Sequence, residues 1–534
     1  GHRTLSGDAR RDLPDATTYE AALAELGVMP DPEDRRRAIL ERAEPLLAGE
    51  AEPSRLRADE DLLQEVVDLC EHPTAFVGAY DTAFFELPDE VIVTALKAHQ
   101  RYFTVESPAG GLRPRFVAVR DGGEEHLDEV RAGNERVLRA RLADALFYWR
   151  FDQQRSPDEH AAALAQVTWL EGFGSVADHT RRAGELAVAL WQDGLGEGAV
   201  PDTLTRAAAL SRFDLVTEMI KDGKEFTKLE GVIAARYARA AGEDPAVCRA
   251  LEQSQRPRSA QGDLPDDRVS MVLAAAWRLD TLAGCWLAGF QPTGAKDPYA
   301  LRRHTLAVLR IVVALEARLD LRAVLARALA PYAAAAGGRD VSLAAAELLD
   351  FVTVRLAGWL QDVEGADPDV VRAVLPVRGH DPADALAWVR ALAGFRERDD
   401  FLRLATGFKR CANILKDDAL PVDQREAAFG RWAEGGRGAA GESFADLDEP
   451  AATALRDAVA GAVAGLAEAE ARGDYVTVFQ TLSALGPRID RFFDEVRVNV
   501  DDASRRAVRV AFLREIHALF LRYADFAEVA PEGE

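Results

Sequence analysis

The 534-residue sequence contains no apolar run that approaches the length needed to span a bilayer. Its first residues, GHRTLSGDARR, lack the apolar segment of a signal peptide. The four cysteines lie far apart and form no C-x-x-C pair; they are Cys70, Cys248, Cys285 and Cys411. This spacing fits reduced, buried thiols better than disulfides or a zinc site. The sequence therefore predicts a soluble, cytoplasmic protein without a membrane segment.

Motifs that bind nucleotide phosphates are also missing. Neither a G-x-x-x-x-G-K-[ST] loop nor a Rossmann G-x-G-x-x-G after a strand is present. A formal net charge of −24 argues against a general nucleic-acid binder, because cationic contacts to phosphate supply most of that affinity. Binding to RNA would therefore require arginines clustered on a few faces, with the carboxylates elsewhere.

The most informative stretch that is present is QPTGAKDPYALRRHTLAVLR, Gln291 to Arg310. Asp297 and Pro298 predict a helix N-cap and first helical position. A turn before them would hold Lys296 beside the free N–H groups of that helix, where a phosphate could bind. The alternative is that Lys296 pairs with a carboxylate of its own chain.

A second cationic helix is predicted over Asn134 to Trp149. Arg136, Arg139 and Arg150 fall near one outer face, which could either hold a phosphate backbone or pair with nearby carboxylates. Before this helix, the segments AFVGAYD, VIVTALKAHQRYFTV and RFVAVRDGG predict strands of an α/β domain. From Ser156 onward the pattern is helical nearly throughout, and the acidic residues of DLVTEMIKDGKEFTKLEG predict a solvated or salt-bridged helix face.

Several long motifs follow one another in the order of a known family. They are LKAHQRYF, GNERVLRARLADALF, DLVTEM, RLDTLAG, the PTG-x-KDP-YALRR block, FKRCANILK and FFDEVRV. Together they resemble the β subunit of bacterial heterotetrameric glycyl-tRNA synthetase. The resemblance implies a tRNA-binding partner of a separate catalytic α subunit in an α2β2 assembly. The family carries a further region before its GHR, so we expect that a preceding part is missing here.

The resemblance also implies a fold class, mainly α and multidomain with an N-terminal α/β domain. Residues 1–154 would form an α/β domain similar to the editing-type module of the phenylalanyl-tRNA synthetase β chain, and 155–340 an HD-like helical domain. Residues 341–398 would be a helical linker or body. Residues 399–534 would form an anticodon-binding helical bundle.

Active HD domains bind a metal through one His, a His-Asp pair and a later Asp. His179 is a candidate for the first ligand, but by ungapped spacing Ser211 and Arg212 replace the pair and Trp277 replaces the last Asp. Most of the ligands are missing, and Arg212 would repel a cation. We therefore expect no metal and no phosphohydrolase activity.

Candidate tRNA contacts follow from the cationic motifs. They are Lys409, Arg410, Phe408, Asn413, Lys416, Arg497, Lys296, Arg302, Arg303, Arg310, Arg136 and Arg139. Phe408 could stack on an unpaired base or belong to the core, and helical spacing is compatible with both.

The chain also lacks the HIGH-like and KMSKS-like motifs of class I synthetases and a class II ATP-binding arginine context. We expect no catalytic residue and no bound cofactor in this chain, because the α subunit would use glycine, ATP and Mg to charge tRNA(Gly). Two other interpretations remain open. One is an HD-type metal-dependent phosphohydrolase acting on nucleotides or tRNA ends, and the other is a stand-alone RNA-binding scaffold.

Overall fold

A computed structural model describes residues 1–529 except 8–10, 14, 50, 51, 99, 416–418, 421 and 435. The side chains of 399, 422, 423, 426, 433 and 446 are also outside the description. The chain divides into two compact units. The first joins Gly1–Val167 with Ala209–Gln255, and the second joins Thr168–Ala208 with Arg256–Glu534. The predicted division into four domains stays a prediction.

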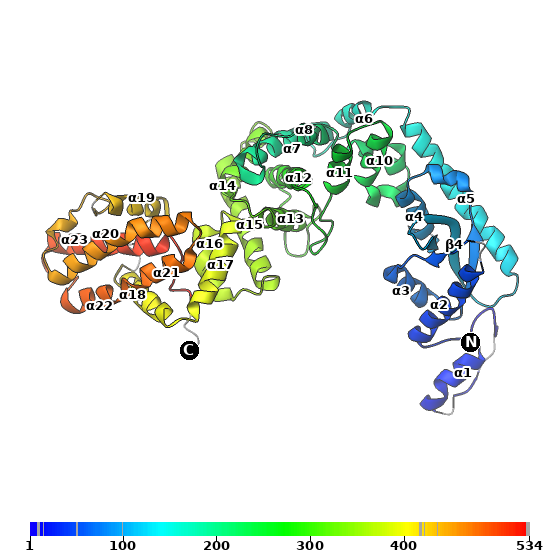
Figure 1. The fold of residues 1–534 in the computed structure, drawn as a ribbon, viewed down its shortest axis with the longest axis horizontal. Coiled ribbons are helices and arrows are strands. Elements are labelled where there is room, and N and C mark those ends of the chain that lie inside the picture. Colours follow the sequence, from blue (N-terminus) through cyan, green and yellow to red (C-terminus); the bar gives the residue numbers. More distant parts are fainter. Residues whose placement is uncertain are drawn as a thin grey trace. The chain divides into compact units, whose positions relative to one another are not determined.

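The first unit combines a small sheet with helices (Figure 1). Its strands are β1 (Arg55–Leu56), β2 (Pro73–Ala79), β3 (Phe103–Glu106) and β4 (Leu112–Asp121). Its helices are α1 (Tyr19–Glu25), α2 (Pro32–Ala48), α3 (Glu60–Leu69), α4 (Asp89–Ala98), α5 (Leu127–Asp152), α6 (Pro157–Ala163), α9 (Glu218–Lys221), α10 (Val232–Ala240) and α11 (Pro245–Gln253). All strands pair antiparallel, in the order β1-β3-β4-β2.

The sheet has helices on both faces, because both sets of alternating side chains are apolar. On one face Ala75 and Val117 join a core with α2 and α3. On the other face Phe116 stacks on Tyr102 at 4.5 Å between ring centroids. Glu135 of α5 accepts a hydrogen bond of 2.8 Å from the backbone N–H of Ala79, at the end of β2. This bond fixes α5 against the sheet.

Part of one predicted strand segment is a helix. AFVGAYD and RFVAVRDGG contain β2 and β4 as expected, and the end of VIVTALKAHQRYFTV contains most of β3, but its first part, VIVTALKA, lies in α4. Its β-branched residues favour a strand locally. However, Val91, Ile92, Ala95 and Leu96 recur at helical spacing and are all buried, and Asp89 and Glu90 lie favourably in the first turn. Tertiary burial therefore overrides local propensity.

The second unit is helical in all its longer elements (Figure 1). They are α7 (Val176–Leu190), α8 (Asp202–Ala209), α12 (Arg268–Leu287), α13 (Leu301–Ala314), α14 (Leu321–Leu329), α15 (Val341–Asp362), α16 (Pro368–Arg378), α17 (Pro382–Arg396), α18 (Asp399–Leu415), α19 (Val422–Ala433), α20 (Pro450–Ala471), α21 (Tyr475–Ser483), α22 (Gly486–Glu495) and α23 (Ala503–Leu521). Helix α12 is buried along most of its length and packs against α7, α13, α14 and α15. Helix α18 packs against α21, α22 and α23, which gives the C-terminal end a bundle.

The cysteines are buried thiols as expected, and the predicted fold class is confirmed in its broad outline. The chain is mainly helical with one small sheet in its N-terminal part. All four cysteines are buried and unpaired, and burial raises the pKa of the Cys411 thiol to about 12. In the described part of the chain, no helix combines the length and apolarity that crossing a membrane requires.

Candidate nucleic-acid interface

Many arginines in the part of the chain that the structure describes form ion pairs with carboxylates of the same chain. Arg236 contacts both Glu90 and Glu252, and Arg431 makes four hydrogen bonds of 2.8 to 3.1 Å to Glu515. Paired cations of this kind offer little to an external phosphate, because their charge is already compensated. The exposed cations that lack such partners are therefore the ones to consider as ligand contacts.

Helix α5 carries two such arginines. Arg136 and Arg139 are exposed, and neither makes an ion pair or side-chain hydrogen bond with any described residue. Their neighbours on the helix are paired: Arg131 contacts Asp128 at 2.7 Å and Arg150 contacts Glu86 at 2.5 Å. The predicted pairing with carboxylates is thus realised at Arg131 and Arg150, whereas contact with a phosphate backbone stays a prediction for Arg136 and Arg139.

Exposed aromatic side chains accompany these arginines, and the sequence analysis did not identify them. Phe147 is 62% exposed and Phe151 is 42% exposed, and their ring centroids lie 5.9 Å apart. Phe147 lies eleven residues after Arg136, which is about three helical turns and the same side of α5. The helical spacing between Arg136 and Phe147 could have indicated this aromatic residue from the sequence alone. Aromatic rings beside cations suit unpaired bases, which stack while cations contact phosphates.

The predicted start of the cationic helix at Gln291–Arg310 is wrong by three residues. Helix α13 begins at Leu301, but Asp297 still caps it: its carboxylate accepts bonds of 2.8 Å from the N–H of Leu301 and 3.0 Å from that of Arg302. Pro298 and Tyr299 lie in the intervening turn. The helix N-terminus is thus occupied by a carboxylate, which disfavours the phosphate site predicted there.

Cations nevertheless gather around this turn. Lys296 and Arg303 are exposed and have no ion pair within the described residues, so the predicted alternative that Lys296 pairs with a carboxylate is not realised. Arg302 donates to the carbonyl of Gly294 at 2.6 Å, and Arg310 donates to that of Ala260 at 2.7 Å. These two bonds leave the arginine charges uncompensated.

Two further features make this surface resemble that of α5. Phe290 and Tyr299 are both exposed, with ring centroids 4.7 Å apart, and they flank Lys296 in sequence. Burial lowers the pKa of Arg355, and the nearby positive charge of Arg302 lowers it further. Like charges therefore accumulate here without full compensation, as at a surface that binds an anion.

Helix α18 differs from α5 and from the turn before α13. Phe408 is buried, only 1% exposed, and stacks on His517 at 4.8 Å, so the structure favours its core alternative. Arg410 contacts Asp490 at 2.6 Å and Asp494 at 3.3 Å, and these hydrogen bonds raise its pKa. Lys409 is exposed and unpaired in the described part of the chain.

The remaining candidates of the C-terminal region lie at the surface or outside the description. Asn413 and Arg497 are exposed, and the carbonyl of Arg497 accepts a bond of 2.7 Å from Arg509. Lys416 lies outside the described residues, as does His99 of the LKAHQRYF motif.

The HD-like positions do not assemble a metal site. His179 and Trp277 lie in the second unit, whereas Ser211 and Arg212 are buried in the first. The Nδ1 atom of His179 contacts Asp280 at 2.5 Å and its Nε2 atom lies 3.3 Å from the Thr281 hydroxyl. Both ring nitrogens are therefore engaged. In the part of the chain that the structure describes, no cluster of three or more His, Cys, Asp or Glu side chains could hold a metal ion.

The carboxylate that reaches His179 was missed by ungapped spacing, which pointed to Trp277. The Trp277 ring packs against His179 at 4.8 Å, but Asp280 lies one helical turn further on the same face of α12. Asp280 also contacts Arg182 at 3.4 Å and accepts a bond of 2.7 Å from Tyr332. A carboxylate held by three side chains is a packing element that joins helices.

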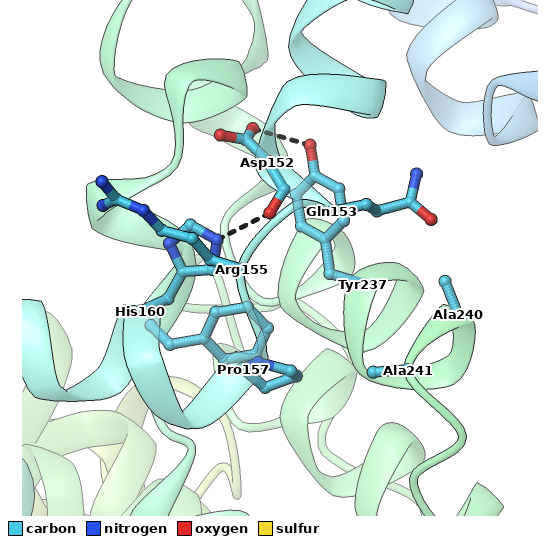
Figure 2. A pocket seen from close by; sticks show the side chains of 9 residues that line it. Asp152, Gln153, Arg155, Pro157, His160, Tyr237, Ala240 and Ala241 are labelled. Carbon is cyan, nitrogen blue, oxygen red and sulfur yellow. Dashed lines mark hydrogen bonds between the residues drawn. The ribbon is translucent and has the colours of Figure 1, made fainter.

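A small cavity in the first unit has a similar structural character. Figure 2 shows Asp152 between His160 and Tyr237. The Asp152 carboxylate accepts bonds from the N–H groups of Glu218 and Met219 and from the Tyr237 hydroxyl, at 2.8 to 3.1 Å, and its backbone carbonyl lies 2.9 Å from His160 Nε2. The cavity has a volume of about 60 Å³, which admits water-sized molecules only. Asp152 therefore caps the start of α9.

Asp214 of DLVTEM also differs from its prediction. The prediction was a solvated or salt-bridged position, but Asp214 is fully buried and accepts bonds from the N–H groups of Gly231 and Ala234 at the start of α10. Burial raises the pKa of this carboxyl group. The residue organises the turn before α10.

Known proteins resemble this chain throughout its length. A family model described as "Glycyl-tRNA synthetase beta subunit" matches residues 1–376. Proteins named glycine-tRNA ligase beta subunit from Anaeromyxobacter sp. (strain K), Moorella thermoacetica and Acidobacterium capsulatum are 37%, 36% and 35% identical over 536, 537 and 533 residues. These matches cover 99 to 100% of this chain and 73% of each relative.

These matches define the class of the protein as a subunit of an aminoacyl-tRNA synthetase, a ligase. Within that class, the chain belongs to the glycyl-tRNA synthetase beta subunit family. The family resemblance of the motifs is thereby confirmed, and nothing in the comparisons favours the phosphohydrolase alternative.

Proposed function

We propose that this chain binds tRNA(Gly) and positions it for a separate α subunit, which uses glycine, ATP and Mg to charge the tRNA. The assembly would be α2β2 and would act in the cytoplasm. Family membership supports the partner and the reaction. A subunit without catalytic groups can raise a rate by converting a bimolecular step into a local one.

One observation supports the RNA-binding role most directly. In a chain of net charge −24, Arg136, Arg139, Lys296 and Arg303 are exposed, have no ion pair among the described residues, and lie beside exposed aromatic side chains on α5 and before α13. Many other arginines of the described residues are compensated by ion pairs within the chain. Local positive patches answer the objection that an acidic envelope repels RNA. The α5 patch would hold one part of the tRNA and the patch at α13 another.

Co-expression with a candidate α subunit tests the proposal. We expect a complex whose mass corresponds to two copies of each chain, and glycylation of tRNA(Gly) that neither chain performs alone. The replacement of both Arg136 and Arg139 by Gln should raise the KM for tRNA with little effect on complex mass. The matched control replaces Arg131 and Arg150 by Gln, because both are ion-paired on the same helix.

Two results would refute the proposal. Charging of tRNA by this chain without the α subunit would place the catalytic site here. Full activity of the α subunit without this chain would remove the need for positioning.

A further inference from the structure

A cavity that lies apart from these surfaces is found in the second unit. It has a volume of about 390 Å³ and is formed by α14, α15, α16, α19 and α23. Its polar lining consists of Arg322, Arg378, Arg425, Arg522, His380, Asp350 and Thr353. Four arginines and one histidine thus line the cavity with only one acidic residue, although the chain as a whole is strongly acidic.

The guanidinium groups of this cavity are not equally compensated. Arg378 contacts Glu470 at 2.9 Å and Asp384 at 3.5 Å, and Arg522 contacts the same Glu470 at 3.1 Å. Arg322 contacts Asp320 at 3.0 Å. Arg425 donates its Nε–H to the carbonyl of Leu420 at 3.0 Å and forms no ion pair with any residue that the structure describes. Its terminal N–H groups are therefore available to a ligand in the cavity.

Two further observations concern how far the positive charges around this cavity are compensated. The buried Nε atom of Arg378 has no hydrogen-bond partner in the described part of the chain. Burial also lowers the pKa of Arg425, and burial together with the charge of Arg322 lowers the pKa of His380. Retaining several half-buried cations around one cavity costs free energy that a bound anion would offset.

The remaining wall of the cavity is apolar. It is lined by Leu349, Leu375, Pro376, Val377 and Leu521. The volume lies within the range of small-molecule sites and exceeds what a single inorganic phosphate fills. Arginines arranged around an apolar wall suit a phosphate ester whose organic part packs against that wall.

We propose that this cavity binds the phosphate group of a nucleotide, with the guanidinium of Arg425 as a principal contact and the apolar wall against the base or sugar. The ligand would be either a free nucleotide or an unpaired nucleotide of an RNA. None of the candidate tRNA contacts named above lines the cavity. The site therefore does not depend on the proposed role of α5 or α13.

Calorimetric titration of the full chain with AMP, adenosine and inorganic phosphate tests the site. We expect saturable binding of AMP at one site and at least tenfold weaker binding of adenosine, because a charge-assisted phosphate contact is lost. Arg425→Gln should weaken AMP binding by about tenfold or more. Arg488→Gln is the matched control, because Arg488 also donates only to a backbone carbonyl in the C-terminal bundle and lies outside the cavity.

The same variants in a tRNA(Gly) binding assay identify the source of the phosphate. Weaker tRNA binding by Arg425→Gln, with AMP acting as a competitor, would assign the site to an RNA nucleotide. Unchanged tRNA binding with weaker AMP binding would assign it to a free nucleotide. If Arg425→Gln lowers the melting temperature, Arg322→Gln provides the same test with a guanidinium whose partner is at the surface.

Three results would overturn the proposal. The first is the absence of saturable AMP binding at about 1 mM together with unchanged tRNA binding by Arg425→Gln. The second is adenosine binding as strong as AMP binding. The third is an equal loss in Arg425→Gln and Arg488→Gln, which would show only a general effect of net charge.

Discussion

Helices α5 and α18 each carry an aromatic residue and two cations, which are spread along the helix on α5 (Arg136, Arg139 and Phe147) and consecutive on α18 (Phe408, Lys409 and Arg410). On α5, Arg136 and Arg139 are unpaired and Phe147 is 62% exposed. On α18, Phe408 is only 1% exposed and Arg410 lies between two aspartates of α22. One helix presents its cations and rings to solvent, whereas the other uses most of them to hold the bundle together.

The difference depends on which carboxylates lie opposite each helix. The aspartates that pair with Arg410 are 80 and 84 residues away in sequence. On α5, Glu86, Asp128 and Glu225 engage Arg150, Arg131 and Arg141, whereas Arg136 and Arg139 have no carboxylate partner among the described residues. A basic motif therefore indicates a nucleic-acid contact only when the opposing surface supplies no carboxylate.

The largest effect that separates the two helices concerns their aromatic residues. Phe408→Ala should destabilise the C-terminal bundle by about 3 to 5 kcal/mol, because it removes a fully buried ring from the core. Phe147→Ala should change stability by no more than about 0.5 kcal/mol, because its ring is largely exposed. Urea unfolding followed by circular dichroism measures both. A stable Phe408→Ala variant with impaired tRNA binding would contradict the core assignment.

The ring that stacks on Phe408 makes the bundle sensitive to acid. Burial lowers the pKa of His517 to about 4, below its usual 6.5. The unfolded chain therefore binds a proton that the folded chain excludes, so this contribution to stability is complete above pH 6.5 and is lost as the pH falls towards 4. Between pH 7.5 and pH 5 we expect a loss of about 2 kcal/mol from this group.

The variant His517→Gln removes the titrating group and serves as the comparison. Its free energy of unfolding should fall less than that of the unmodified chain between pH 7.5 and pH 5, as measured by urea unfolding at each pH. An equal fall in both proteins would mean that His517 is protonated in the folded bundle.

The sequence predicted local structure well where one face of a helix is apolar. The helix predicted over Asn134 to Trp149 lies within α5, whose Leu138, Leu142, Ala145 and Trp149 are buried at helical spacing. The segment VIVTALKA was assigned to a strand because its β-branched residues carry a strong local preference. Only the burial provided by the rest of the first unit shows that it forms α4.

The candidate interface was less accessible from the sequence, because pairing between distant residues determines it. From spacing alone, Arg136 and Arg410 were equally good candidates for a tRNA contact. No sequence pattern near Arg410 indicates that it pairs with Asp490. Ungapped spacing likewise selected Trp277, although Asp280 makes the contact to His179. Side chains one helical turn apart share a face, so spacing cannot decide which of them reaches a partner.

Neutralising the free arginines of α5 should have an intermediate effect. With Arg136 and Arg139 both replaced by Gln, tRNA(Gly) binding should fall by about tenfold, and the slope of log K against log salt should flatten by about 1.4 to 1.8, which corresponds to two lost phosphate contacts. Fluorescence anisotropy at several salt concentrations measures both quantities. The control variant with Arg131 and Arg150 replaced by Gln should bind within about twofold of the unmodified chain. Equal losses of affinity in the two variants would mean that paired and unpaired arginines of α5 contribute alike to tRNA binding.

The smallest effect tests the comparison in the opposite direction, by making α18 resemble α5. Replacing Asp490 and Asp494 by Asn removes both partners of Arg410, whose guanidinium then remains beside Phe493 at 5.3 Å from the ring centroid. Exposed ion pairs contribute up to about 1 kcal/mol, so tRNA(Gly) binding should strengthen by no more than about threefold to fivefold. The salt slope should steepen by about 0.7 to 0.9 if the released arginine reaches a phosphate.

The control for this last test replaces Asp448 and Asp501 by Asn. This change removes the same negative charge from the same bundle without removing the partners of Arg410. Both residues are exposed and make no ion pair with a described residue. A gain confined to the first variant would show that pairing with α22, and not the sequence of α18, keeps Arg410 from acting as the arginines of α5 do. An equal gain in both variants would reduce the difference between the two helices to net charge, because long-range attraction does not depend on which cation is free.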